Sequence, residues 1–230
     1  MAKEATGACL DVRPSDFSLD FSQAVLTHSN LGGEGPDSNE PPTMLFSGIG
    51  TDPATGRLVD LEVASTSTFL PKNSANNVIH NGMGRINLEA PQYNDEGSIA
   101  YTYVDVELNF LDALDGTPVV LSRFHLSFLD LDTSQTTNTG YTSAECIRTK
   151  QFDTVHLDSS TELTNSGTPD SDGFYQFCGT TYGTGGNDPD SPLELNADEK
   201  TRTVTFSFIH VSTVQAKLLL GCAWSHEHEH

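Results

Sequence analysis

The sequence predicts an all-β protein built as a two-sheet antiparallel sandwich with long loops and one short helix. Apolar and polar residues alternate with a period of two in many segments of the 230-residue chain, which is the pattern of half-buried strands. Only 36% of the residues are hydrophobic, and 19 glycines and 11 prolines indicate frequent turns. The strand segments are spread evenly and no linker separates them, so we expect one domain over residues 17–225.

The expected elements follow a lead-in at residues 1–16, which we expect a disulfide to pin. Strands are expected at residues 17–26, 44–49, 58–69, 99–110, 124–129, 145–155, 174–178, 201–211 and 214–222. Ser191-Pro192-Leu193-Glu194 has the form of a capping box with proline at the first helical position, which predicts a helix over residues 192–200. Residues 226–230 alternate histidine and glutamate, and we interpret them as a purification tag.

The longest strand pattern lies in residues 98–145. Its two runs are joined by Asp115-Gly116, a dipeptide that readily adopts the positive φ angles of a tight hairpin turn. We therefore expect the two runs to pair as one long hairpin. The second run leads directly into Asp130-Leu131-Asp132, and the following strand begins at Glu145.

This succession of carboxylates predicts a metal site. Asp130 and Asp132 are two residues apart at a strand end, so their side chains share a face and repel each other unless a cation or hydrogen-bond donors intervene. Calcium takes about six to eight oxygen ligands and tolerates irregular loops. We predict a calcium site formed by Asp130, Asp132 and Glu145. The alternative is that the two aspartates only accept hydrogen bonds from loop N–H groups.

Two further sets of polar residues occupy the long loops. A second cation site is predicted from four aspartates, namely Asp170, Asp172, Asp188 and Asp190. Side chains suited to hydrogen bonding with sugar hydroxyls form a predicted ligand-binding set, namely Asn76, Asn77, His80 and Tyr182. Asparagine also stabilises turns, so a purely structural role for the two amides is the alternative.

Four cysteines, Cys9, Cys146, Cys178 and Cys222, lack any CxxC spacing. Such usage in a chain rich in Thr, Ser, Gly and Asp favours two disulfides and an oxidising compartment over a thiolate metal site. Of the three pairings that four cysteines allow, we favour Cys146 with Cys178 and Cys9 with Cys222. The alternative is free thiols in a cytosolic protein.

Charge and motifs exclude several functions. The net charge of −21, from 32 acidic and 11 basic residues, disfavours nucleic acid and anionic membrane surfaces as partners. No run of 18 apolar residues is present, so we expect no membrane insertion. The chain also lacks G-x-S-x-G, HExxH and P-loop motifs, and we assign no catalytic residue.

Several segments together resemble a known group of proteins. LGGEGPDSNEP, VDLEV, NGMGRINL and FHLSFLDLD, in that order, are similar to segments of secreted β-sandwich modules of algae, other microbial eukaryotes and bacterial surface proteins. The resemblance extends from about residue 17 to 220. It implies a jelly-roll-like extracellular domain that is stabilised by calcium and serves adhesion or glycan binding.

We therefore expect a secreted or cell-surface calcium-binding recognition module. Its expected partner is a polysaccharide or an extracellular surface protein, and homo-oligomerisation is left open. One alternative is a secreted glycan hydrolase or lyase that uses the acidic cluster. Another is a structural subunit of an extracellular filament or coat.

Overall fold

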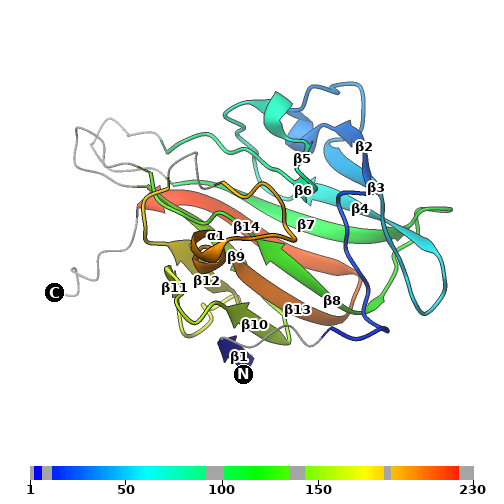
Figure 1. Ribbon diagram of the computed structural model, residues 1–230. Helices are drawn as coiled ribbons and strands as arrows, with labels where there is room; N and C mark the ends of the chain where they lie inside the picture. The colour runs from blue at the N-terminus through cyan, green and yellow to red at the C-terminus, as the bar shows by residue number, and fades with distance from the viewer. Residues whose placement is uncertain (1–2, 7–11, 92–100, 135–142, 184–187, 223–230) are drawn as a thin grey trace.

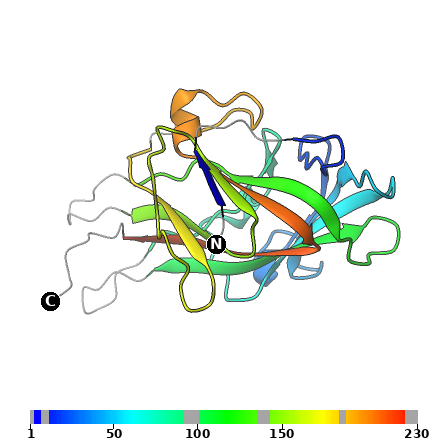
Figure 2. The same ribbon diagram turned by 90° about the horizontal axis from the view of Figure 1, so that it is seen from below.

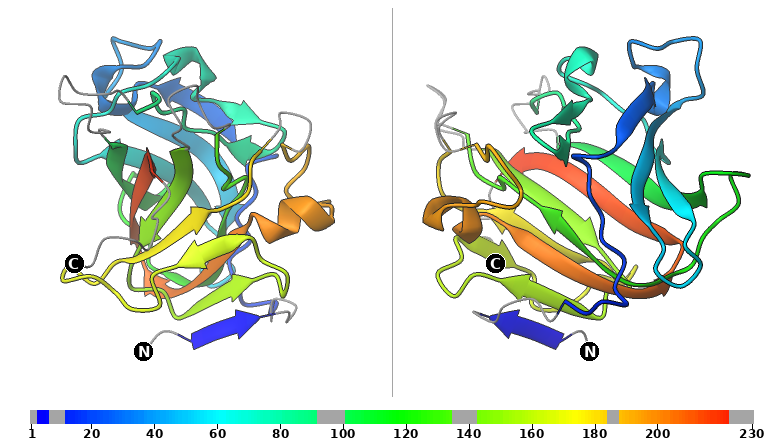
Figure 3. Two further views of the ribbon diagram at one scale, coloured as in Figure 1. Left: turned by 90° about the vertical axis from the view of Figure 1, so that its left-hand side faces the viewer. Right: turned by 45° about the vertical axis from the view of Figure 1, so that its right-hand side comes forward.

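The computed structural model describes residues 3–6, 12–91, 101–134, 143–183 and 188–222 (Figure 1). Strands dominate these residues, and they form two sheets packed face to face with one short α-helix, so the predicted fold class is confirmed. Figure 3 shows the two layers, in which β7 and β14 of the larger sheet lie across from β8 and β13 of the smaller sheet.

The larger sheet has eight strands in the spatial order β11-β12-β9-β14-β7-β4-β3-β2. Their bounds, in that order, are β11 (Leu163–Asn165), β12 (Tyr175–Gly179), β9 (Ser143–Thr149), β14 (Thr213–Cys222), β7 (Thr102–Asp112), β4 (Leu58–Ser65), β3 (Thr43–Thr51) and β2 (Val25–Ser29). All neighbours in this sheet run antiparallel.

The smaller sheet has four strands in the order β1-β10-β13-β8. Their bounds are β1 (Lys3–Thr6), β10 (Thr154–Leu157), β13 (Val204–Val211) and β8 (Leu121–Phe128). Figure 2 shows β1 beside β10, and this pair is parallel whereas the other pairs of the sheet are antiparallel. The remaining elements are the β5 (Ile79–His80) and β6 (Met83–Gly84) hairpin, the short 3-10 helices η1 (Leu31–Gly33) and η2 (Ser74–Asn76), and α1 (Ala197–Thr201).

Phenylalanines from both sheets form the centre of the core. Phe110 of β7 meets Phe124 of β8 with ring centroids 4.7 Å apart, and Phe124 stacks on Phe208 of β13 at 5.4 Å. Phe206 of β13 contacts further rings at the other end of the core. The side chains of these four phenylalanines are at most 1% exposed. They hold the two sheets together because they bury apolar surface between them.

A turn forms at Asp115-Gly116, although only its glycine has a positive φ, and the predicted long hairpin does not form. Gly116 has a φ of +70°, and Thr117 donates its N–H and its hydroxyl to the Asp115 carboxylate. Only the residues directly after the turn pair with β7. There the Val119 N–H donates to Phe110 O at 2.8 Å. Strand β7 is already flanked by β4 and β14, so β8 finds no free edge and instead joins the smaller sheet (Figure 1).

The expected first strand at residues 17–26 is also wrong. Phe17 makes a single parallel bridge with Phe124, and Asp20 then closes a turn by accepting hydrogen bonds from the N–H and hydroxyl of Ser22. Beyond that bridge, Leu19, Phe21 and Ala24 pack onto the core outside any strand, and a strand begins only at Val25.

The helix is shorter than expected and starts later. Ser191 accepts the N–H of Leu193 and closes a turn rather than capping a helix. The capping box lies five residues farther along, where Asn196 Oδ1 accepts the Glu199 N–H and Glu199 accepts the Asn196 N–H. None of the helices in the described part of the chain has the length and apolar character that a membrane-spanning segment requires.

One predicted disulfide is confirmed. Cys146 of β9 and Cys178 of β12 lie opposite each other in adjacent strands and are bonded. Cys9 lies outside the described residues, so its pairing with Cys222 stays a prediction, as does the assignment of residues 226–230.

The aromatic core makes a prediction about stability. Phe206→Ala removes a fully buried ring that contacts four other phenylalanines, and large-to-small core changes of this kind cost about 3 to 5 kcal/mol. Ile209→Ala on the same strand is the control, because this side chain is 40% exposed and its loss should cost under about 1 kcal/mol. Equilibrium denaturation measures both, and equal losses would contradict the proposed core.

Candidate functional site

The candidate site lies where β8 ends and β9 begins. Thr133 in the connecting segment forms isolated bridges with Ala144 and with Tyr182, so this segment lies between the two later parts of the chain. Glu145 N–H donates to the backbone oxygen of Asp132 at 2.8 Å, which places these two acidic residues next to each other. The backbone thus brings Glu145 next to Asp132, and the calcium site expected from Asp130, Asp132 and Glu145 stays a prediction.

Asp130 and Asp132 flank a residue that anchors the segment. The Leu131 side chain is buried, and its N–H donates to Arg202 O at 3.0 Å. Asp130 has a φ of +61°, a left-handed conformation that is uncommon outside glycine but tolerated by aspartate. The two carboxylates are consequently half-buried instead of standing out into solvent.

Burial and mutual repulsion shift all three acids in the same direction. Burial raises the pKa of Asp130 to about 6, and the charges of Asp132 and Asp188 add to this effect. The pKa of Asp132 is raised to about 6, mainly by burial. Glu145 has a pKa raised to about 8, first by burial and then by the charges of Asp132, Asp130 and Asp188. The site therefore holds more negative charge than its surroundings compensate.

Two arginines offset this charge in part. Arg202, at the end of α1, lowers the pKa of both aspartates, and Arg85, which follows β6, lowers the pKa of Asp130 and Glu145. Arg202 is 7% exposed and its Nε donates to Glu162 at 3.0 Å. Its Nη1 is buried without a hydrogen-bond partner among the described residues. These arginines come from distant parts of the chain, so no local sequence pattern links them to the carboxylates.

Gly183 makes room for the Asp132 carboxylate. Its N–H donates to Thr133 O at 3.1 Å, and any β-carbon at this position would overlap the carboxylate oxygens of Asp132. Tyr182, the preceding residue, is 47% exposed. This tyrosine, which belongs to the predicted ligand-binding set, therefore lies beside the acidic cluster.

The donor chemistry of the cluster suits calcium, but its side chains do not form a coordination sphere. Carboxylates and backbone carbonyls are the ligands that calcium prefers. Among the described residues, however, no group of three or more His, Cys, Asp or Glu side chains is placed so that it could hold a metal ion. Binding by Asp130, Asp132 and Glu145 together would thus require side-chain rotation.

The four aspartates of the second predicted site have different surroundings. Asp170 pairs with Arg148 and accepts the N–H groups of Asp172 and Phe174, both at 2.9 Å, which is the role of a turn-closing residue. Asp188 instead acts on the first cluster, because its charge raises the pKa of Asp130, Asp132 and Glu145. Asp190 is exposed. The second site stays a prediction.

Asn77 of the predicted ligand-binding set has a structural role. Asn77 is fully buried, its Oδ1 accepts the Asn87 N–H at 2.7 Å, and its backbone oxygen accepts the Ser29 hydroxyl. Asn76 is half-buried within the turn of η2, and His80 is exposed in the β5–β6 hairpin. Asn77 is thus closed off from solvent, whereas His80 and Tyr182 remain accessible.

Known proteins match this chain through structure alone. A scan against models of protein families finds no match, and neither does a search of curated proteins. Among solved structures, the N-terminal domain of the Streptococcus gordonii adhesin Sgo0707 is similar with a TM-score of 0.53 and 13% identity, over 99% of this chain and 67% of that one. At such identity the likeness concerns the fold.

Two weaker similarities are to the adhesin domain of PrgB from Enterococcus faecalis. The structure of that domain bound to DNA has a TM-score of 0.41 and 11% identity, over 79% of this chain and 60% of that one. A second structure of the same domain has a TM-score of 0.40 and 14% identity, over 80% and 63%. This chain therefore spans less than two thirds of either PrgB structure.

The acidic cluster predicts a pH-dependent stability. The pKa of Glu145 is about 8 in the folded protein, above its ordinary value of 4.5, so the folded state binds this proton more tightly than the unfolded state does. Folding stability contributed by the protonated group is thus present at pH 4.5 and is lost as the pH rises through 8. Without divalent cations, Glu145→Gln should raise the free energy of unfolding at neutral pH by a few kcal/mol, and the gain should vanish in acid.

Denaturant titrations from acid to alkaline pH in EDTA measure this difference. Glu194→Gln is the matched control, because Glu194 is an exposed residue outside the cluster. An unchanged or lowered stability of Glu145→Gln at neutral pH would contradict the account of the cluster.

Proposed function

We propose that this chain is a cell-surface recognition module whose acidic end takes up calcium and, with it, binds an extracellular polysaccharide or surface protein. The observation that carries the proposal is the gathering of Asp130, Asp132 and Glu145 at one end of the sandwich, within the field of Asp188 and beside the exposed Tyr182. The shared fold with an adhesin domain supports the same class of function.

The uncompensated charge of the buried carboxylates favours binding of a calcium ion. Buried carboxylates that repel one another destabilise the folded state when they are ionised, and Arg202 and Arg85 compensate this only in part. A bound divalent cation would supply the missing positive charge. The backbone hydrogen bond from Glu145 to Asp132 keeps these two acidic residues adjacent, which favours their joint use as ligands.

The disulfide favours an extracellular setting. Cys146 and Cys178 are bonded, and such bonds persist mainly in oxidising compartments such as the cell exterior. The net charge of −21 disfavours DNA as a ligand, since the phosphate backbone would be repelled. We therefore place polysaccharides and proteins ahead of nucleic acids as partners.

Calcium should stabilise the wild-type protein. Ligand binding to the folded state alone adds about 2.7 kcal/mol at a concentration about 100 times Kd, which is several degrees in the melting temperature. Thermal melts in calcium and in EDTA measure the shift. Asp132→Asn should abolish most of it, whereas the exposed Asp198→Asn of α1 should retain it. A wild-type melt that is indifferent to calcium would contradict the calcium proposal.

Binding assays test the recognition function. We expect the protein to bind at least one of a panel of immobilised xylan, laminarin, alginate, chitin and extracellular matrix proteins, without releasing reducing ends and without retaining duplex DNA. Release of reducing ends that disappears in a folded Asp130→Asn variant would instead identify a glycan hydrolase or lyase. Regular filaments or sheets in electron micrographs would identify a coat subunit.

A further inference from the structure

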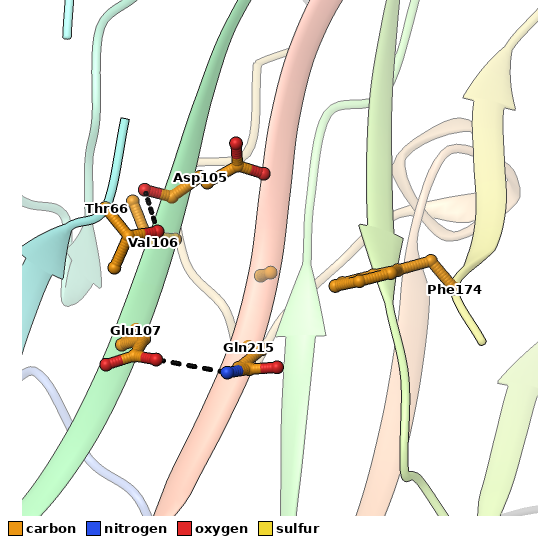
Figure 4. A pocket seen from close by; sticks show the side chains of 7 residues that line it. Thr66, Asp105, Val106, Glu107, Phe174 and Gln215 are labelled. Carbon is orange, nitrogen blue, oxygen red and sulfur yellow. Dashed lines mark hydrogen bonds between the residues drawn. The ribbon is translucent and has the colours of Figure 1, made fainter. Parts of the chain in front are cut away.

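A second polar surface lies on the outer face of the larger sheet. In β7 the even-numbered residues are buried in the core, so Asp105 and Glu107 point to the opposite face. They stand across from Lys217 and Gln215 of β14. A shallow groove is lined by Asp105, Glu107 and Gln215 together with Thr66 and Phe174 (Figure 4). Lys217 does not line it but pairs with Asp105 at its edge. The alternation along β7 predicts that Asp105 and Glu107 face outward, but it does not predict that Phe174 lies near them.

The polar side chains of the groove are held in place. Gln215 Nε2 donates to Glu107 Oε1 at 3.0 Å, as the dashed line in Figure 4 shows. Lys217 Nζ lies 3.0 Å from Asp105 Oδ1 and 4.2 Å from the centre of the Tyr103 ring. Within the described residues, no hydrogen bond occupies Gln215 Oε1 or the second carboxylate oxygens of Asp105 and Glu107. The groove thus offers oriented acceptors whose positions are already fixed.

Phe174 forms an apolar wall beside this polar floor. It precedes β12, and its ring extends toward β14 in Figure 4. Lys150 Nζ lies 4.4 Å from the ring centre and Arg148 Cζ lies 5.6 Å from it. Both cations therefore lie within the distance of a cation–π contact with the Phe174 ring.

The charges around the groove select a neutral ligand. Asp105 and Glu107 would repel an anion, whereas Lys217, Arg148 and Lys150 would repel a cation. A purely apolar ligand would leave Gln215 Oε1 and the second carboxylate oxygens of Asp105 and Glu107 without a hydrogen-bond donor. A polyhydroxylated ring remains, because its hydroxyls can donate to the carboxylates and the amide oxygen while its C–H face packs on an aromatic ring.

We propose that this groove is a binding site for neutral hexose units of a polysaccharide. Glu107 and Asp105 accept hydrogen bonds from sugar hydroxyls, Gln215 contributes its amide oxygen, and Phe174 contacts the apolar face of the sugar. The inference rests on the proposed recognition function, for which it names the ligand class. It uses a different surface from the acidic end, since Glu145 shares its face of β9 with the fully buried Ile147.

The test is to titrate the full chain with cellohexaose, laminarihexaose and mannohexaose and to measure binding by isothermal titration calorimetry. We expect at least one of these neutral oligosaccharides to bind. Glu107→Gln and Phe174→Ala should each weaken that binding roughly tenfold or more, the loss expected for a hydrogen bond to a charged group or for one stacked ring. Glu62→Gln is the matched control, because Glu62 faces outward on neighbouring β4 but does not line the groove. Melting curves establish that each variant is folded.

Two results would contradict the proposal that this groove binds hexose units. One is that no neutral oligosaccharide binds at millimolar concentration, and the other is that binding survives both Glu107→Gln and Phe174→Ala. Asp132→Asn separates this inference from the proposed function. If it alone abolishes oligosaccharide binding, the groove is wrong and the acidic end is the recognition site. If groove variants lose binding while Asp132→Asn retains it and calcium has no effect, the groove stands and the role of the acidic end fails.

Discussion

The packing of Phe110 against Phe124 is the contact on which the rest of the structure depends. These rings lie on either side of the Asp115-Gly116 turn, one in each sheet, so the chain must cross between the layers at that point. The crossing sends β8 along the smaller sheet toward the far end of the sandwich. There its last residues lead into Asp130 and Asp132, directly beside the start of β9. The acidic end is thus a consequence of how the two layers are joined.

Local pattern predicted much of this arrangement, and non-local pairing accounts for the failures. Alternation along β7 correctly indicated which residues face the core, because side-chain direction in a strand is a local property. It could not indicate that β7 already has two neighbours, so the expected hairpin with β8 was wrong. The same limit applies to residues 17–24, whose alternating apolar side chains pack on the core although this segment makes only one bridge, from Phe17 to Phe124.

The candidate site likewise combines residues that a local sequence pattern predicts with residues that only tertiary packing brings there. The spacing of Asp130 and Asp132 and the position of Glu145 after a loop predict that the three lie near one another, and the backbone hydrogen bond from Glu145 to Asp132 agrees with this proximity. The calcium site itself stays a prediction. Asp188, Arg85 and Arg202 act on the same carboxylates but come from three other segments. Their contribution depends on tertiary packing, and nothing in their immediate sequence marks it. For the same reason Asn77, which seemed a ligand-binding amide, is a buried support of its own loop.

The distribution of charge separates the two surfaces that we propose for binding. Only 11 basic residues accompany 32 acidic ones, yet Arg148, Lys150 and Lys217 gather on the outer face of the larger sheet. There they balance Asp105 and Asp170 by direct pairing, so the groove is locally close to neutral in a strongly acidic protein. At the acidic end the nearby arginines do not balance four carboxylates. A neutral polymer therefore meets little electrostatic resistance at the sheet face, whereas the acidic end favours a cation or a partner that brings one.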